Sequence, residues 1–410
     1  MEIYLVGGAV RDRRLQVEVK DRDWVVVGGN ASKLIALGYK SVGKDFPVFL
    51  HPESHEEYAL ARVERKTGHG YAGFEFDASE NVTLEEDLSR RDLTINAMAE
   101  TEDGELIDPF DGHSDLEAGV LRHVSEAFSE DPVRILRVAR FAARFHARGF
   151  TVHESTLALM KHMVDNGEVN HLVSERVWAE TQRALAGDNP QVFFEVLRAC
   201  GALRVLFPEL EALYGVPQPA KWHPEIDTGV HTMMVLYQAS LLSDDPEIRF
   251  AALVHDLGKA TTPKDILPSH YGHEQRSVDL TIKLCKRLTI PNRYRDLAVI
   301  VGEFHGNVHR VFDLRKNTVL KLLQKTDAFR KPERFEAFLL SCEADSRGRL
   351  GLETKPYPQA DYLRKALELA SAVKVKDFIT PDLIGEKIAL ELYKRQLRTL
   401  DALSDEHPQN

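Results

Sequence analysis

Two acidic residues at the start of an apolar segment are the first candidates for chemistry in the sequence. Asp21 and Asp23 precede the valines at residues 25–27, a run typical of a buried strand. Because side chains two apart in a strand point the same way, both carboxylates can share one hard cation such as Mg²⁺. An isolated pair of this kind is more often a solvated strand end, here flanked by Lys20 and Arg22. The pair alone leaves both interpretations open.

A glycine pair upstream favours the catalytic interpretation. Gly7 and Gly8 follow a strand expected at residues 3–6 and precede the start of a helix at residues 9–12. Such a turn lets backbone N–H groups approach a phosphate, although alone it is usually just a tight turn. A phosphate-binding turn followed by paired carboxylates on the next strand is what metal-dependent nucleotidyl transfer needs. Asp21 and Asp23 are therefore predicted to be catalytic and to bind Mg²⁺.

A further candidate segment spans residues 90–99. Arg90 and Arg91 precede an expected apolar helix that contains Asn96. The arginines can hold phosphate there, and Asn96 can reach a ribose or a metal-bound group. The alternative is that both arginines only pair with the acids at residues 85–87.

Five arginines recur on one face of the helix expected after Pro132. Asp131 followed by Pro132 is a strong helix start. The arginines are Arg134, Arg137, Arg140, Arg144 and Arg148, with no acid between the first and the last. A merely solvated face would interleave acids, so this face favours anion binding. Asp131 and Arg134 can also match the edge of a base, one accepting and one donating; an ordinary intrahelical ion pair is the alternative.

A second set of candidate ligands lies in the C-terminal half. His255 and Asp256 are adjacent near the end of an apolar helix expected at residues 250–257, and Lys259 follows. Burying such a pair is costly unless something binds it. His231 begins another expected helix upstream, and Asp327 lies downstream.

The elements that must position these residues divide the chain into an α/β part and a helical part. Strand signals are confined to residues 1–125, at 3–6, 24–27, 47–50, 58–61 and 106–107. From residue 131 onward apolar residues recur at helical spacing, at 133–145, 176–185, 192–199, 250–257 and 319–323. The predicted fold class is α+β, with a small mixed sheet in an N-terminal head followed by all-α regions. The best linker signal lies at residues 215–219.

Composition limits the class of protein. A chain of 410 residues is too long for one ordinary domain, and a net charge of −11 excludes a generally basic nucleic-acid binder. Any RNA must therefore be held by a local basic patch. Cys200, Cys285 and Cys342 lack the spacing of a disulfide framework or a cysteine metal site. No apolar run is long enough for a membrane helix and the N-terminus does not read as a signal peptide, so a cytoplasmic location is expected.

Taken in order, these segments resemble the class II tRNA nucleotidyltransferases, the CCA-adding enzymes, in their bacterial multifunctional form with an appended HD domain. The likeness rests on residues 5–12 with 21–23, 90–97, 108–116 and 130–134. It implies nucleotide contacts from Gly8, Arg11, Arg91, Asp131, Arg134, Arg137 and Arg140, with Asp131 and Arg134 reading the base. One departure is the stretch 13–16, where the family usually has an apolar pair and a glycine; it affects packing of the first helix more than chemistry.

The resemblance also implies the reaction and its partners. C, C and A are added in turn to the 3′ end of tRNA from CTP and ATP, without a nucleic-acid template. The implied partners are tRNA, CTP and ATP, with no membrane, and the chain is expected to be a monomer or homodimer. The implied domains are a head at 1–129, a neck and body at 130–215, an HD domain at 225–330 and a C-terminal helical tail region at 331–410.

The second set of ligands resembles the metal site of the HD superfamily. The pattern is reproduced by His231, His255, Asp256 and Asp327. It implies catalysis by His255 and Asp256 with a divalent metal, and 2′,3′-cyclic phosphodiesterase, 2′-nucleotidase and phosphatase activities. Imidazole ligands favour a transition metal, expected to be Ni²⁺. Further candidate ligands are His270, His273 and His305, although histidines on helix surfaces are common.

Three other functions are compatible with parts of this pattern. Poly(A) polymerases share the head motifs but not the HD segment. A signalling protein with nucleotidyltransferase and HD modules would explain neither the Asp131–Arg134 pair nor the arginine helix. An RNA-binding module with an inactive head is disfavoured because Asp21 and Asp23 are both present.

Overall fold

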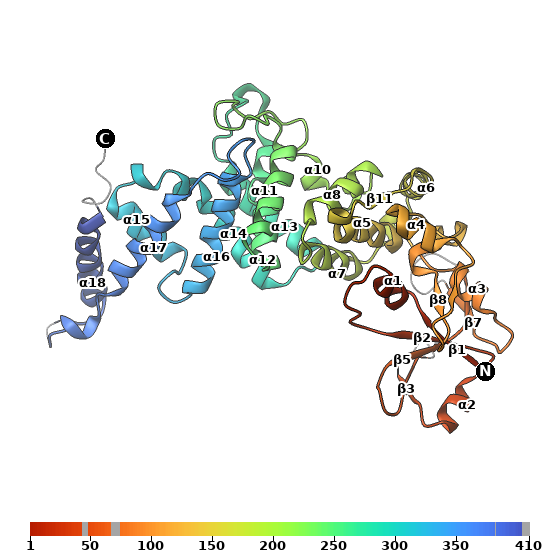
Figure 1. Cartoon of the computed structure of the whole chain (residues 1–410). Helices are drawn as coiled ribbons and strands as arrows, with labels where there is room; N and C mark the ends of the chain where they lie inside the picture. The colour runs from red at the N-terminus through yellow and green to blue at the C-terminus, as the bar shows by residue number, and fades with distance from the viewer. Residues whose placement is uncertain (43–47, 67–73, 382, 404–410) are drawn as a thin grey trace. The chain divides into compact units, whose positions relative to one another are not determined.

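The structure, a computed structural model, describes residues 1–42, 48–66, 74–381 and 383–403. They form two compact units (Figure 1). The first unit comprises Met1–Ala184 with Val192–Leu206, and the second comprises Leu185–Gln191 with Phe207–Asn410. The α+β fold class is confirmed, because the strands gather in the first unit and the second is helical.

The first unit is built on a seven-stranded mixed sheet with the strand order β3-β4-β5-β2-β1-β8-β9. Its strands are β1 (Glu2–Val6), β2 (Asp23–Val27), β3 (Lys40–Val42), β4 (Val48–Leu50), β5 (Glu57–Leu60), β8 (Ala99–Glu100) and β9 (Leu106–Ile107). β1 and β2 pair antiparallel with Val6 opposite Asp23, whereas β2 and β5 run parallel. This register sets Asp23 beside the end of β1, where the glycine turn begins. Small two-stranded sheets join β6 (Val63–Lys66) to β7 (Phe74–Asp77) and β10 (Val120–Leu121) to β11 (Thr151–Val152).

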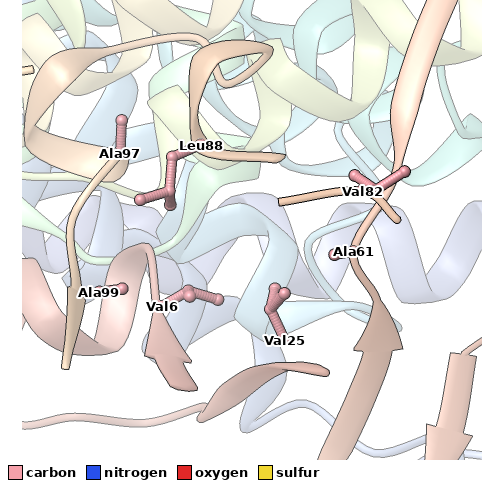
Figure 2. Packing of buried hydrophobic residues seen from close by; sticks show 7 residues of the cluster. All are labelled: Val6, Val25, Ala61, Val82, Leu88, Ala97 and Ala99. Atoms are coloured by element: carbon pink, nitrogen blue, oxygen red, sulfur yellow. The ribbon is translucent and has the colours of Figure 1, made fainter. Parts of the chain in front are cut away.

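The two faces of the sheet pack into different apolar clusters. One cluster, drawn in Figure 2, consists of Val6, Val25, Ala61, Val82, Leu88, Ala97 and Ala99. The other includes Val26, Leu34, Phe49, Tyr58 and Leu60. Neighbouring valines of β2 thus enter opposite clusters, as strand alternation requires. Burial on both faces fixes the register of β2, and with it the position of the acids at its start.

Helices fill the rest of the first unit. They are α1 (Gly8–Arg14), α2 (Ala31–Ala36), α3 (Leu84–Ser89), α4 (Gly112–Ala118), α5 (Val133–Phe145), α6 (Glu154–Asp165), α7 (Ser174–Leu185), α8 (Pro190–Ala199) and α9 (Leu203–Leu206). The last residue of α7 and the first two residues of α8 belong to the second unit. The arginine helix α5 spans the predicted residues. A correction concerns the apolar helix expected after Arg91, which is only a single 3₁₀ turn (Thr94–Asn96) before β8. The Asp92 carboxylate accepts from the Leu93 N–H, and the Thr94 N–H donates to the carbonyl of Arg122, so these N–H groups bond outside a helix.

The second unit is a helical bundle. Its helices are α10 (Pro208–Glu211), α11 (Thr228–Leu242), α12 (Pro246–Val254), α13 (His273–Arg287), α14 (Asn292–His309), α15 (Lys316–Lys325), α16 (Pro332–Arg347), α17 (Pro358–Ser371) and α18 (Glu386–Thr399). α16 packs against α11, α12 and α14. At its end Gly348 lies so close to α11 that an added Cβ would stand 2.4 Å from Cγ2 of Val235. The boundary expected before residue 331 would therefore separate α16 from the helices that it covers.

The segment expected to be the main linker belongs to the second unit. The carbonyl of Val216 accepts hydrogen bonds from both the N–H and the hydroxyl of Thr228, and the carbonyl of Pro217 accepts from Nε2 of His270. The chain instead passes between the units near residues 185–192 and 206–207. Proline and glycine mark a turn at 215–219, but these hydrogen bonds hold the turn against the bundle.

A buried arginine ties the start of the second unit to its bundle. Arg249 of α12 is 1% exposed. Its guanidinium donates to the carbonyls of Leu185 and Gly187, both at 2.7 Å, and to those of Ser240 and Ser243. Because a buried charge needs such partners, this arginine fixes where residues 185–191 lie within the second unit.

We expect Arg249→Met to lower the free energy of unfolding by about 3 kcal/mol, because several buried carbonyls lose their donor. The matched control is Arg293→Met, which removes an arginine with a 62% exposed side chain paired to Glu247. The control should cost less than about 1 kcal/mol. Urea denaturation followed by circular dichroism measures both, and equal losses would contradict the structural role of Arg249.

Candidate active sites

The first candidate site forms where β1 and β2 meet the glycine turn. Asp21 and Asp23 are both exposed at the start of β2. Partial burial is the largest influence on Asp23 and raises its pKa; Arg91 opposes this rise and Asp21 adds to it. Two neighbouring carboxylates of this kind are suited to a hard divalent cation with oxygen ligands.

The glycine turn brings an arginine to these acids. Gly7 has a φ of 68°, and a Cβ there would lie 2.7 Å from Nη1 of Arg91. Only glycine therefore allows Arg91 to approach the turn. Arg90 and Arg91 also pair with the fully buried Asp87, at 2.7 Å and 3.2 Å. The alternative expectation, that both arginines pair with the acids at residues 85–87, is thus met at Asp87. This ion pair orients Arg91 toward the turn.

Arg11 is held in the interior of the first unit. Its Nε donates to Oδ1 of Asp12 at 2.8 Å, and its Nη1 donates to the side-chain oxygen of Asn96. The guanidinium carbon lies 5.0 Å from the ring centre of Phe141 and 5.3 Å from that of Phe145. Asn96 in turn donates to Asp92, so both residues belong to one buried polar network.

The arginines of α5 are met by acids from other elements. Arg137 pairs with Asp92 at 2.7 Å, Arg140 with Glu180 at 2.5 Å and Arg144 with Asp12 at 2.9 Å. Burial alone would raise the pKa of Asp92, but Arg137, Asn96 and Arg134 together outweigh it and the pKa falls to about 2. The arginine face therefore has counter-charges, although none comes from α5 itself. This corrects the sequence argument, which inferred anion binding from the absence of acids within the helix.

The two residues expected to read a base have different partners. Arg134 donates to the carbonyls of Ala127 and Arg90, both at 2.6 Å. Asp131 accepts from the N–H of Val133 and from Arg176 of α7, whose Nη2 lies 2.7 Å from the carboxylate. The role of Arg176 was not predicted from the sequence, because Arg176 lies far from Asp131 along the chain and no local pattern indicates their contact.

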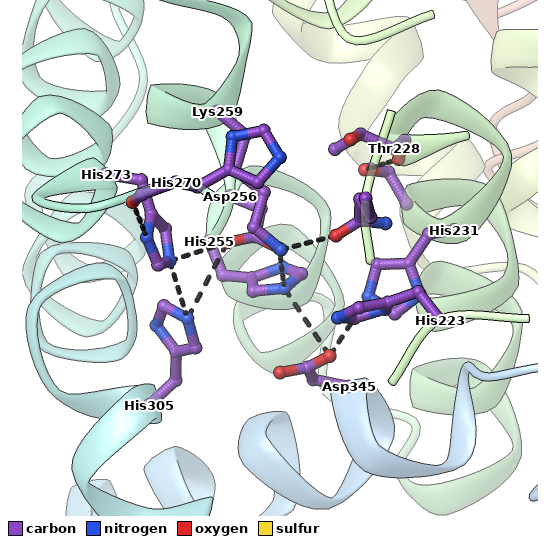
Figure 3. Close-up of polar contacts among 12 residues, drawn as sticks. His223, Thr228, His231, His255, Asp256, Lys259, His270, His273, His305 and Asp345 are labelled. Atoms are coloured by element: carbon purple, nitrogen blue, oxygen red, sulfur yellow. Dashed lines mark hydrogen bonds and ion pairs between the residues drawn. The ribbon is translucent and has the colours of Figure 1, made fainter. Parts of the chain in front are cut away.

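The second candidate site lies inside the helical bundle and is drawn in Figure 3. His231 of α11 has Nε2 3.0 Å from Oδ1 of Asp345, which comes from α16. His255 directly follows α12 and has Nε2 3.1 Å from Oδ2 of Asp256 and 3.7 Å from Oδ1 of Asp345. All four residues are buried. The structure thus brings together the predicted His231, His255 and Asp256.

Asp327 does not join this cluster, which corrects the predicted ligand set. Its carboxylate is bound by Arg330 at 2.6 Å and lies 3.6 Å from Arg334. Asp345 stands in the cluster instead, between His231 and His309, whose Nε2 is 2.6 Å from Oδ2. Both acids follow helical segments rich in apolar residues, so sequence pattern alone did not distinguish them.

Histidines of the cluster are fixed in one tautomer. Nδ1 of His255 faces the carbonyl of Ala252 at 2.7 Å, and Nδ1 of His305 faces that of Val301 at 3.0 Å. A carbonyl only accepts, so each Nδ1 carries a proton, and in the neutral ring each Nε2 presents a lone pair. Metal-binding histidines are commonly oriented in this way. His270 is different, because its Nε2 faces the carbonyl of Pro217.

Polar atoms in the cluster fit a divalent cation. Nε2 of His255 and Oδ1 of Asp256 are buried and have no hydrogen-bond partner within the described residues. Burial is the largest influence on His255 and would lower its pKa, but Asp256 and Asp345 outweigh it and raise the pKa. Nitrogen and oxygen donors of this kind suit transition metals.

Three segments of the chain match known protein families. Residues 3–122 match the family described as Poly A polymerase head domain, residues 149–214 match Probable RNA and SrmB-binding site of polymerase A, and residues 228–330 match HD domain. The Multifunctional CCA protein of Thioalkalivibrio sulfidiphilus is 64% identical over 406 residues, which is 99% of each chain.

Solved structures share the fold. A CCA-adding enzyme in complex with ATP has a TM-score of 0.65 and 21% identity, with 98% of this chain and 87% of that chain covered. The Thermotoga maritima CCA-adding enzyme complexed with tRNA(CCA) has a TM-score of 0.61 and 21% identity, with the same coverage of 98% and 87%. Across the described ranges, none of the helices has the length and apolarity needed to cross a membrane.

We expect Asp345→Asn to weaken Ni²⁺ binding by at least about 10-fold, a loss typical even of groups that only support a ligand. Asp327→Asn is the matched control and should bind Ni²⁺ as the unchanged protein does. Isothermal titration calorimetry on both variants gives the comparison. The reverse order of affinities would restore Asp327 to the ligand set.

Proposed function

The chain belongs to the multifunctional CCA protein family, and we propose that it adds C, C and A to the 3′ end of tRNA from CTP and ATP. The observation that carries this proposal is the conjunction of the acids of β2, the glycine turn and the arginine helix in one unit. The second unit adds a phosphohydrolase that acts on 2′,3′-cyclic phosphates, 2′-nucleotides and phosphomonoesters. Full-length identity of 64% to a Multifunctional CCA protein favours this over poly(A) polymerase, which is named only in the families matched at residues 3–122 and 149–214.

In the first unit Asp21 and Asp23 are the catalytic carboxylates and hold Mg²⁺. When bound, the cation neutralises phosphate charge and lowers the pKa of the attacking hydroxyl. Gly8 lets the backbone approach the triphosphate, and Arg91 lies beside the same turn to bind phosphate oxygens. Arg11 reaches the nucleotide only if its guanidinium is redirected from Asp12.

Base choice rests on Asp131, Arg134 and the newly found Arg176. An aspartate that accepts from an exocyclic amino group selects C and A over U and G, because only C and A present such a donor on the matching edge. Arg176 holds the Asp131 carboxylate in place. Arg137 and Arg140 lie on the same helix face and supply positive charge to the nucleotide.

In the second unit His231, His255, Asp256 and Asp345 hold a divalent transition metal, for which we propose Ni²⁺. When bound, such an ion lowers the pKa of a coordinated water and polarises a phosphate ester. Lys259 lies 2.6 Å from Asp256 and can contact a phosphate oxygen. This site uses imidazole nitrogens where the first site uses carboxylates, so the two are expected to differ in metal preference.

The remaining proposals follow from this function. tRNA, CTP and ATP are the partners, the location is the cytoplasm, and the protein acts as a monomer or homodimer. Within the first unit we place the head at 1–129 and the neck from 130, and we extend the HD domain beyond residue 330 to include α16. The direct test supplies tRNA that lacks its last three nucleotides with each labelled nucleoside triphosphate in turn. Addition of A alone, in long tracts, would support poly(A) polymerase instead.

The two activities should be lost independently. Asp23→Asn should abolish CTP and ATP addition but spare hydrolysis of 2′,3′-cyclic nucleotides, whereas His255→Gln should do the reverse. Neither variant removes a ligand of the other site. Both activities are measured on the same preparations with Mg²⁺ or Ni²⁺ added. Loss of both activities in His255→Gln, with unchanged thermal unfolding, would point to one shared centre.

Base choice should relax when the Asp131 contact is broken. Asp131→Ala and Arg176→Ala should each raise incorporation of UTP relative to CTP by about 10-fold, the discrimination of one good polar contact to a base. Arg204→Ala removes an exposed arginine paired to Asp165 and serves as control. A uniform rate loss without changed preference would make Asp131 and Arg176 structural residues.

A further inference from the structure

A loop of the second unit is held in one conformation beside the proposed phosphohydrolase site. The loop spans residues 215–227 and contains three prolines, each of which fixes its own φ. Its ends are joined, because the N–H of Gln218 donates to the carbonyl of Ile226 at 2.8 Å. Between them the N–H of Trp222 donates to the carbonyl of Pro219 at 3.0 Å. The directions of the loop's side chains are therefore set by its backbone.

Two side chains of the loop reach the buried cluster. The ring centre of His223 lies 4.7 Å from that of His231, and Figure 3 shows the two rings beside each other. Oε1 of Gln218 accepts from Nζ of Lys259 at 2.6 Å, and the same ammonium lies 2.6 Å from Asp256. The stretch of loop between these two anchors is thus held close to the cluster.

Gln218 has a buried hydrogen-bond donor that is not used. The residue is 2% exposed, and its Nε2 has no partner within the part of the chain that the structure describes. Because a buried amide N–H without an acceptor is costly, this group is suited to an oxygen of a bound molecule. The ammonium of Lys259, bound to the same amide, favours an anionic one.

Trp222 presents an aromatic ring to solvent on the same loop. It is 58% exposed, whereas Trp178 is 6% exposed and Trp24 stacks on Tyr58. Nζ of Lys221 lies 4.6 Å from the centre of the Trp222 ring. Single exposed apolar side chains are common, but this one combines an open ring, an adjacent cation and a fixed backbone beside the cluster. Such a combination suits a ligand that is both aromatic and anionic.

We propose that Trp222 stacks on the base of a nucleotide whose phosphate lies at the cluster, and that the Gln218 amide donates to an oxygen of the same sugar phosphate. The proposal rests on the phosphohydrolase function and deepens it, because it makes nucleotides, rather than phosphate esters of any kind, the preferred substrates. A nucleotide fits this arrangement because one ribose joins its base to its phosphate. The competing explanation is a tryptophan that is exposed without a ligand.

Two cyclic phosphates separate these explanations. 2′,3′-Cyclic AMP carries a base, whereas glycerol 1,2-cyclic phosphate has the same five-membered ester without one. Hydrolysis of each is measured on the full-length protein with Ni²⁺ added. We expect Trp222→Leu to raise KM for cyclic AMP by about 10-fold, the effect of losing one base stack, with kcat and hydrolysis of the glycerol compound unchanged. An equal loss on both substrates, or an unchanged KM for cyclic AMP, would overturn the proposal.

Further variants assign the contacts. Trp222→Phe keeps an aromatic face and should recover most of the KM effect. Gln218→Met removes the donor at similar volume and should raise KM for both substrates by about 5-fold; no effect on either would exclude its role. The matched control is Tyr237→Leu, which removes another exposed aromatic ring of the second unit and should leave both KM values unchanged. A rise in KM for cyclic AMP as large as that of Trp222→Leu would overturn the assignment to Trp222.

Intrinsic fluorescence follows binding without hydrolysis. Added 2′-AMP should quench the exposed indole of the unchanged protein, and this quenching should be absent in Trp222→Phe. Quenching without hydrolysis of any offered phosphate ester would support the stacking site and contradict the proposed function. Hydrolysis of both cyclic phosphates without quenching would overturn the stacking site and leave the proposed function intact.

Discussion

The cost of burying a charge without a counter-charge determines how both units are built. In the first unit Asp87 and Asp92 lie below the surface, and each is met by arginines from the segments around it. In the second, Arg249 is surrounded by carbonyl groups. These contacts fix Arg91, Arg137 and residues 185–191 in place. Positions of the functional groups are therefore set by long-range charge pairing as much as by apolar packing.

Within the bundle the same constraint acts on histidines through their tautomers. Each backbone carbonyl that accepts from an Nδ1 turns the opposite nitrogen into an acceptor. The Nε2 atoms of His255, His273 and His305 lie within 3.6 Å of the Asp256 carboxylate. Backbone carbonyls thus orient the histidines of the second unit, and Glu225 and Gly348 orient His231 through contacts with its Nδ1.

The sequence predicts the parts of this structure that depend on local periodicity or on adjacent residues. The valines of β2 and the span of α5 follow from spacing, and His255 with Asp256 from adjacency. What it does not predict depends on distant contacts: Arg176 reaching Asp131, and Asp345 rather than Asp327 entering the cluster. The helix expected after Arg91 was wrong for a related reason. Residues 93, 95 and 97–99 are all fully buried, so burial leaves no periodicity to separate a helix from a turn and strand.

The position of Asp345 on α16 has a consequence for how the protein is made. Domains fold as units during synthesis, beginning at the N-terminus. The first unit has all of its residues by Leu206, whereas the histidine cluster lacks Asp345 until α16 has been translated and has packed onto α11. A nascent chain therefore completes the nucleotidyl-transfer unit well before the hydrolytic one. Ribosomes that stop after Leu206 and before α16 would release a protein with a complete first unit and a bundle that lacks Asp345.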